Sequence, residues 1–176
     1  SAVLYEVSTG RVLYQKNMEE PRAIASTTKI MTALLTIENT DLTEKVTIKP
    51  EFTGIEGTSL YLKAGEQITV ETLLYGLMLQ SGNDAALVLA DHVAGDIPTF
   101  VSMMNARAQE LGMENTHFEN PNGLPAEGHV SSALDMAKLA AAAMQNPDFQ
   151  KVVSSKTYAA NGRAFSNHNR LLKMRE

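Results

Sequence analysis

IASTTKIMTALLTIE, residues 24–38, is the stretch of this chain in which a helical pattern and a reactive pair of side chains coincide. Residues spaced three and four apart lie on one face of an α-helix, and an apolar face of this kind packs against the core. The stretch contains four apolar residues at this spacing: Ile30, Ala33, Leu34 and Ile37. It therefore predicts an amphipathic helix around which other elements pack.

Ser26 and Lys29 stand at the start of this predicted helix. A serine in the first turn can accept hydrogen bonds from unpaired backbone N–H groups, and a lysine three residues later lies on the same face. A desolvated lysine can take the proton of a neighbouring serine hydroxyl and make it a nucleophile. The positive end of the helix dipole disfavours a protonated lysine there, by roughly 0.3–1 kcal/mol. The pair predicts nucleophilic catalysis, although a helix cap followed by a solvated lysine would have the same sequence.

Composition excludes several classes of protein. The chain has 176 residues, of which 44% are apolar and 20% charged, as expected for one globular domain, with or without a subdomain. Its net charge of −5 and the lack of a basic block argue against a nucleic-acid partner. It has no cysteine, and its four histidines lack ligand spacing, so we expect no disulfide and no metal site. No apolar run has membrane-spanning length, and no signal peptide is visible.

Periodicity, turn residues and caps divide the rest of the chain into short elements. Thr69, Asp96 and Ser132 each precede a helical pattern as a capping residue. We expect hairpins at residues 2–16 and 157–165, strands near 46–48 and at 59–62, and helices at 70–80, 84–94, 98–111, 132–145 and 147–153.

The tripeptide Ser81-Gly82-Asn83 separates two strongly apolar helical patterns. Ser and Gly suit a tight turn at this position. A turn between two buried helices would also carry a hydroxyl and an amide side chain into a cleft. The sequence leaves both interpretations open.

Four stretches together resemble one family of enzymes. They read STTK at residues 26–29, LLYGLMLQSGNDAA at 73–86, FENPNGLP at 118–125 and HVSSALDMA at 129–137. Each short motif is weak by itself, but their order and their long surrounds extend the match over essentially the whole chain. The sequence resembles the low-molecular-mass penicillin-binding proteins, which are the serine D-alanyl-D-alanine carboxypeptidases of bacterial cell-wall metabolism.

This resemblance implies the α+β class, an α/β sandwich with the β-lactamase/transpeptidase-like fold. In this fold a sheet flanked by helices packs beside an all-helical subdomain, and the active site lies in the cleft between them. We expect residues 1–176 to form such a catalytic domain, with the helical subdomain at roughly residues 66–150.

The family's third motif, Lys-Thr-Gly on a strand of the cleft, does not occur in the sequence. Lys156-Thr157-Tyr158 lacks the glycine and precedes the expected place. The missing strand should also bring the second donor of the oxyanion hole, and losing one such donor typically costs about 10²–10³ in rate. We therefore expect the domain to be incomplete at its C-terminus, with the remaining strands supplied by a C-terminal segment or a second chain.

The resemblance also implies roles for individual residues. Ser26 would be the nucleophile that attacks the carbonyl of the penultimate D-alanine, and its backbone N–H would be one donor of the oxyanion hole. Lys29 would be the general base, and Ser81 would be the proton shuttle toward the leaving D-alanine. Asn83 would hydrogen-bond the substrate amide and Lys29. No cofactor or metal is implied.

The implied function is that of a serine D,D-carboxypeptidase. Such an enzyme removes the terminal D-Ala from peptidoglycan stem pentapeptides through an acyl-enzyme and binds β-lactam antibiotics covalently. It works outside the bacterial cytoplasmic membrane, either secreted or membrane-associated.

Other functions remain open. One is a class A β-lactamase, which needs a deacylating Glu in a Glu-x-x-Leu-Asn pattern that we do not find after the second motif. Another is a glutaminase of related fold, although the loop signatures are those of the carboxypeptidases. A third is a non-catalytic β-lactam or peptidoglycan-binding module, and a measured deacylation rate would separate a β-lactam sensor from an enzyme.

Overall fold

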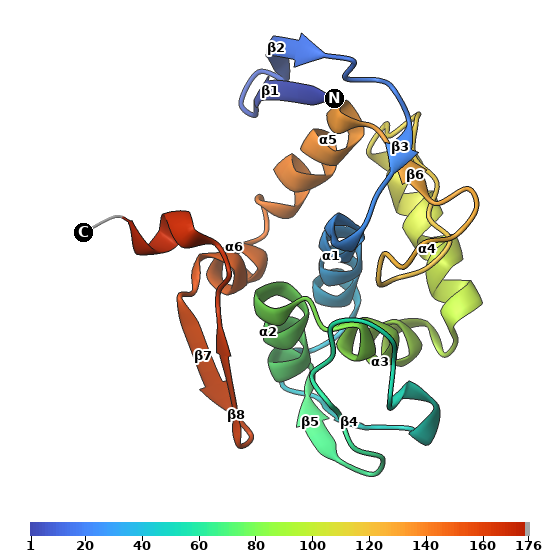
Figure 1. Cartoon of the computed structure of the whole chain (residues 1–176), viewed down its shortest axis with the longest axis vertical. Helices are drawn as coiled ribbons and strands as arrows, with labels where there is room; N and C mark the ends of the chain where they lie inside the picture. Colours follow the sequence, from blue (N-terminus) through green and yellow to red (C-terminus); the bar gives the residue numbers. More distant parts are fainter. Residues whose placement is uncertain (175–176) are drawn as a thin grey trace.

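A computed structural model describes residues 1–174, and six α-helices are the longest elements of this part of the chain (Figure 1). Their bounds are α1 Lys29–Asn39, α2 Val70–Gln80, α3 Asn83–Ala94, α4 Ile97–Glu110, α5 Ala133–Ala143 and α6 Pro147–Ser154. Three 3₁₀ helices accompany them, η1 Ser26–Thr28, η2 Pro50–Phe52 and η3 Arg170–Lys173. Helix α1 lies at the centre, where the other five α-helices all contact it.

Helix α1 is enclosed rather than amphipathic. The four residues of its predicted apolar face are buried or partly buried against the core, but Met31 and Leu35 are buried as well. The hydroxyls of Thr32 and Thr36 are also buried, and they donate to the backbone oxygens of Pro121 and Thr32 at 2.6 and 2.8 Å. These hydrogen bonds satisfy polar groups that would otherwise destabilise the core. No helix within residues 1–174 is both long and apolar enough to cross a bilayer.

Capping residues begin three helices where the sequence predicts them. The side chains of Thr69, Asp96 and Ser132 accept hydrogen bonds from the N–H three residues on, at 3.2, 2.7 and 3.1 Å. Each such cap contributes about 1 kcal/mol to helix stability. Helix α2 has the predicted bounds, and its strongly apolar pattern is explained because most of its residues are buried.

The strands form four separate antiparallel ladders, and with the helices they make the expected α+β structure. The pairs are β1 Ala2–Glu6 with β2 Arg11–Lys16, β3 Arg22–Ala23 with β6 Val130–Ser131, β4 Lys45–Thr47 with β5 Gln67–Thr69, and β7 Thr157–Ala160 with β8 Arg163–Ser166. Both predicted hairpins are confirmed, whereas the β3–β6 pair was not predicted. Within the described part of the chain, no ladder has a third strand.

The strand predicted at residues 59–62 is wrong, because Asp84 binds the polar groups of that segment. Its buried carboxylate accepts hydrogen bonds from the N–H groups of Leu60 and Leu62, at 2.9 and 3.2 Å, and from the hydroxyl of Ser59 at 2.7 Å. Tyr61 lies between them with a φ of +56°. N–H groups that converge on one carboxylate cannot also form a ladder with a neighbouring strand.

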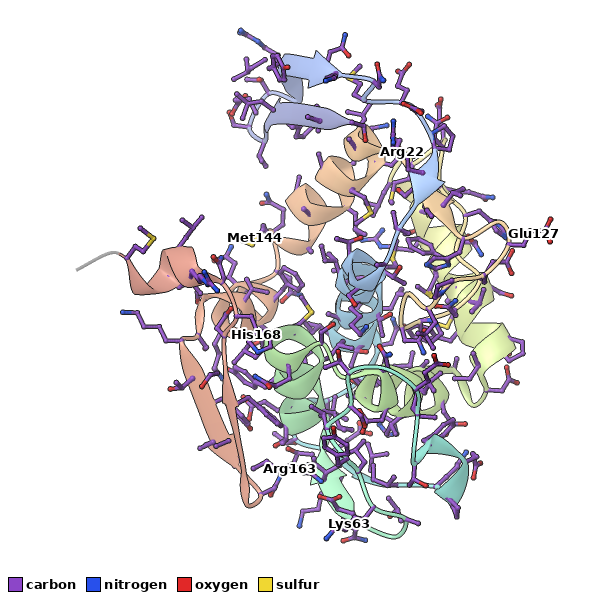
Figure 2. All side chains as sticks on the ribbon, viewed as in Figure 1. Arg22, Lys63, Glu127, Met144, Arg163 and His168 are labelled. Atoms are coloured by element: carbon purple, nitrogen blue, oxygen red, sulfur yellow. The ribbon has the colours of Figure 1, made fainter. Side chains whose placement is uncertain are left out.

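Arg163 ties the second hairpin to the same segment. Figure 2 shows it at the turn end of the β7–β8 hairpin, near the loop that carries Lys63. Its guanidinium donates to the backbone oxygen of Leu60 at 2.7 Å and pairs with the carboxylate of Glu66 at 2.8 Å. A guanidinium that binds both a carboxylate and a carbonyl fixes the position of the hairpin.

The first hairpin is the least buried part of the fold. Every residue of β2 is exposed, and Leu4, Leu13 and Tyr14 are each more than half exposed. Helix α5 contacts β1, and an apolar hollow of about 280 Å³ lies between them, with Met144 at its rim 44% exposed. These apolar side chains are thus left in contact with solvent rather than packed in the core.

Candidate active site

Ser26 lies on the 3₁₀ turn η1, directly before α1. The sequence left open that its hydroxyl caps the helix, but no side-chain cap closes η1 or α1. The hydroxyl instead accepts a hydrogen bond from Nζ of Lys29 at 3.2 Å. The 3₁₀ turn leaves Ser26 exposed while Lys29, at the first α-helical position, is only 2% exposed. An accessible hydroxyl is thus paired with a buried amine.

Lys29 donates to three oxygens. Besides Ser26, these are Oδ1 of Asn83 at 2.8 Å and the backbone oxygen of Asn122 at 2.5 Å. None of the ion pairs within residues 1–174 involves Lys29, and burial lowers its pKa to about 8. A neutral amine keeps two N–H groups for the carbonyl oxygens of Asn83 and Asn122, and its lone pair then faces the hydroxyl of Ser26. This geometry is suited to the transfer of a proton from the hydroxyl to the amine.

Asn83 is held in one orientation by the segment before β5. Its Nδ2 donates to the backbone oxygen of Glu56 at 2.8 Å, and its backbone N–H donates to that of Thr58 at 2.7 Å. Because Nδ2 faces a carbonyl, Oδ1 must face Lys29. Gly57 has a φ of +84°, and a Cβ there would lie 2.7 Å from Nδ2 of Asn83. The glycine is required for this close approach.

Ser81 ends α2 in the left-handed conformation, with a φ of +60°. It is half-buried and lines a hollow of about 310 Å³ together with Ser26 and Lys29. The remaining lining residues are Thr27, Ile30, Leu77 and Met78, which make most of the wall apolar. The structure therefore brings together Ser26, Lys29 and Ser81 at one hollow, and Asn83 joins them through Lys29.

Residues 118–129, the clamp loop, complete the surroundings of Lys29. Asn120 and Asn122 lie in the stretch FENPNGLP that carries the family resemblance, but the sequence did not predict that the backbone oxygen of Asn122 binds Lys29. Gly123 lies against the peptide that joins Ala25 to Ser26, so that a Cβ at this glycine would overlap the oxygen of Ala25. The Asn-Pro-Asn-Gly pattern was the signal for this contact, because it predicts a tight turn that another backbone can approach.

Two other predictions concern metal ligands and the incomplete third motif. Within residues 1–174 no group of three metal-ligating side chains comes together, and the four histidines carry no metal-site geometry there. Thr157 of the incomplete Lys-Thr-Tyr motif begins β7, whose Tyr158 stacks on Tyr75 of α2 with ring centroids 3.8 Å apart. The motif serves hairpin packing and does not line the hollow at Ser26.

Comparisons with known proteins agree with this geometry. D-alanyl-D-alanine carboxypeptidase DacF of Bacillus subtilis is 46% identical over 145 residues, covering 80% of this chain and 37% of that protein. DacC of Escherichia coli is 38% identical over 182 residues, covering 97% of this chain and 46% of that protein. The chain thus spans about half the length of the curated relatives it matches.

Solved structures show the same fold. A D-alanyl-D-alanine carboxypeptidase of Mycobacterium tuberculosis superposes with a TM-score of 0.92 at 32% identity, covering 98% of this chain and 67% of that one. Penicillin binding protein 5 of Haemophilus influenzae has a TM-score of 0.89 at 33% identity, covering 97% and 52%. The predicted fold class and resemblance are confirmed. A family model described as D-alanyl-D-alanine carboxypeptidase matches residues 1–176, and the chain belongs to this family.

Proposed function

We propose that this chain carries the nucleophile and base of a serine D,D-carboxypeptidase, which removes the terminal D-Ala from peptidoglycan stem pentapeptides. The observation that carries the proposal is the pairing of exposed Ser26 with buried Lys29, whose pKa lies near 8 without a carboxylate partner among the described residues. A structural lysine would be expected at an acidic partner or in solvent. A buried lysine that faces only neutral oxygens is suited to accept a proton at neutral pH.

In the proposed reaction the four site residues act one after another. Neutral Lys29 takes the proton of Ser26, whose Oγ attacks the carbonyl carbon of the penultimate D-Ala. The backbone N–H of Ser26 donates to the developing oxyanion, and Nδ2 or Oδ1 of Asn83 binds the substrate amide. The proton passes through Ser81 to the leaving nitrogen, so that D-Ala departs and an ester with Ser26 remains. Water then hydrolyses this ester and restores the hydroxyl.

A β-lactam would enter by the same first step. Oγ of Ser26 attacks the lactam carbonyl, the ring C–N bond breaks, and the nitrogen receives the proton from Lys29. The leaving group stays attached, so the ester persists. Peptidoglycan peptides and β-lactams are thus the proposed partners. Because peptidoglycan lies outside the cytoplasmic membrane of a bacterium, the proposed location of this protein is outside that membrane as well.

A further segment or a second chain completes the sheet in this proposal. Exposed β2 and the apolar hollow between β1 and α5 support it, because the rest of residues 1–174 leaves both surfaces uncovered. Such a segment would bring the Lys-Thr-Gly strand and the second oxyanion donor. Residues 1–176 would then belong to one transpeptidase-like catalytic domain, with residues 66–150 as its helical subdomain.

The test is the intact mass of the protein at its full native length, before and after benzylpenicillin, with the adduct mapped by peptide. We expect one adduct, located on Ser26, in the wild type and none in Ser26→Ala. Lys29→Met should form it at least about 10³ times more slowly, because the base is lost. Lys49→Met, which removes an exposed lysine, serves as the matched control and should react like the wild type.

The later course of the adduct separates the alternatives. Slow loss of the adduct together with release of D-Ala from a pentapeptide would support the carboxypeptidase. Rapid loss would indicate a β-lactamase, and a stable adduct without D-Ala release would indicate a binding or sensor module. Absence of an adduct on Ser26 would refute the proposal.

A further inference from the structure

Three hydrogen bonds attach the clamp loop to residues 28–32, which directly follow Ser26 and Thr27 in the chain. The hydroxyl of Thr32 donates to the backbone oxygen of Pro121 at 2.6 Å, and Nζ of Lys29 donates to that of Asn122 at 2.5 Å. The third attachment joins Oγ1 of Thr28 to Nε2 of His129 at 2.8 Å. The first two use backbone oxygens of the loop, whereas the third joins two side chains that the proposed reaction does not use.

The hydrogen bonds of His129 determine its protonation state. The side chain is 2% exposed, and its Nδ1 accepts the backbone N–H of Glu119 at 2.9 Å. Since a backbone N–H can only donate, Nδ1 carries no proton. The neutral ring must therefore carry its proton on Nε2, which donates to Oγ1 of Thr28. His129 thus connects the start of the clamp loop to the end of the turn η1.

We infer that neutral His129 is a positioning residue for Ser26, acting through its hydrogen bond to Thr28. Thr28 is fully buried, and its backbone N–H closes η1 by donating to the oxygen of Ala25 at 3.0 Å. Fixing Thr28 therefore fixes the turn that presents Oγ of Ser26 to the base. This inference rests on the proposed function, since it concerns the reactivity of the same serine.

Protonation of His129 would break this arrangement. A proton on Nδ1 would face the N–H of Glu119, so that two donors would oppose each other. The pKa of His129 is lowered mainly by burial, with a smaller lowering from His117 and an opposing effect from the Glu119 carboxylate. The neighbouring elements carry two cations, Lys29 of α1, which binds the same loop at Asn122, and Arg22 of β3, whose exposed guanidinium pairs with Glu20. The neutral ring is thus maintained at neutral pH.

Two substitutions at Thr28 separate positioning from packing. Thr28→Val keeps the shape and removes the hydroxyl, whereas Thr28→Ser keeps the hydroxyl and removes a methyl group. If the hydrogen bond positions Ser26, acylation by benzylpenicillin should slow roughly three- to tenfold in Thr28→Val and stay near the wild-type rate in Thr28→Ser. A packing role predicts the reverse order, because a lost methyl leaves a cavity.

Variants of the two histidines give an independent measurement. In His129→Asn the amide oxygen can still accept from Glu119, but the donor to Thr28 is gone, so we expect a similar slowing. His117→Asn changes an exposed neighbour in the same region and is the matched control. The logarithm of the acylation rate should fall with slope one below the pKa of Lys29. In the wild type, protonation of His129 should add a further fall of roughly three- to tenfold, so that the slope exceeds one over that range, and His129→Asn should keep a slope near one.

Nuclear magnetic resonance of ¹⁵N-histidine in the protein at its full native length tests the ring directly. We expect the signals absent from His129→Asn to show a proton on Nε2 and none on Nδ1 at pH 7, and the Nε2–H signal to move in Thr28→Val. A proton on Nδ1, or equal acylation rates in Thr28→Val and wild type, would overturn the inference. Absence of any Ser26 adduct in the wild type would instead refute the proposed function, and the inference with it.

Discussion

Raising the pH should accelerate the acylation of Ser26 over the range in which Lys29 loses its proton. Because burial lowers the pKa of Lys29 to about 8, about one tenth of the molecules carry a neutral lysine at pH 7 and nearly all do at pH 9.5. The rate constant should therefore rise about tenfold over this interval. A lysine that kept its ordinary value of 10.5 would be neutral in about 0.03% of molecules at pH 7, so burial increases the reactive fraction about 300-fold.

Asn83→Asp tests whether this pH dependence belongs to Lys29. It places a carboxylate oxygen where the amide oxygen now lies 2.8 Å from Nζ. A negative charge at this distance favours the ammonium form and raises the pKa of a lysine by about 1–3 units. We expect the midpoint of the pH profile to rise by at least about one unit, and the rate at pH 7 to fall about tenfold or more.

The assay is stopped-flow acylation by a chromogenic β-lactam between pH 6 and pH 10, with the adduct mapped to Ser26 at each end of the range. Lys49→Met is again the control, because Lys49 is exposed and pairs with Asp91 away from the site. A rate that stays constant between pH 6 and pH 9 would refute the assignment of Lys29 as base. An unchanged midpoint in Asn83→Asp would refute it equally, because the new charge would then have no effect on the titrating group.

Three further predictions concern stability and the clamp loop. The pKa of Lys29 is about 8 in the folded protein and 10.5 when unfolded, so the unfolded state binds more protons between these two pH values. The free energy of unfolding should therefore rise with pH across this window by up to about 3 kcal/mol. Urea unfolding measured at several pH values should show no such rise in Lys29→Met. Asp84→Asn should lower the free energy of unfolding by about 2–4 kcal/mol, because an amide cannot accept all the donors of residues 59–62, and a stability equal to that of the wild type would contradict this account. Gly123→Ala should slow acylation and lower the melting temperature, because its Cβ would overlap the oxygen of Ala25, whereas Gly162→Ala, whose Cβ would meet open space, should leave acylation unchanged although its φ of +70° is also strained.

The helices could be predicted from the sequence because their signals are local. Each of three capping side chains accepts a hydrogen bond from the backbone N–H three residues later, and the structure confirms all three caps, at Thr69, Asp96 and Ser132. The same locality explains the failure at residues 59–62. Alternating apolar residues there looked like a strand, but their N–H groups bind Asp84, a residue more than twenty positions later. No local pattern contains that partner.

The site, like the fold, was predictable where its residues lie close together in the sequence. Ser26 and Lys29 are three residues apart, so the sequence itself brings their side chains together. Asn83 was assigned through the family resemblance, and the structure places its oxygen 2.8 Å from Lys29. The roles of Asn122 and His129 were not predicted, since one acts through a backbone oxygen and the other through a hydroxyl 101 positions away.

The sequence by itself determined the helices, their caps, the spacing of the serine and lysine, and the family. Tertiary structure decided the chemistry of the lysine. Its side chain differs from an exposed one only in being buried by α1, α3 and the clamp loop, and that burial lowers its pKa to about 8. Tertiary structure also decided which polar groups pair across long sequence distances. Burial and long-range pairing depend on which segments meet, and the energy of a charge depends on what surrounds it rather than on its neighbours in the chain.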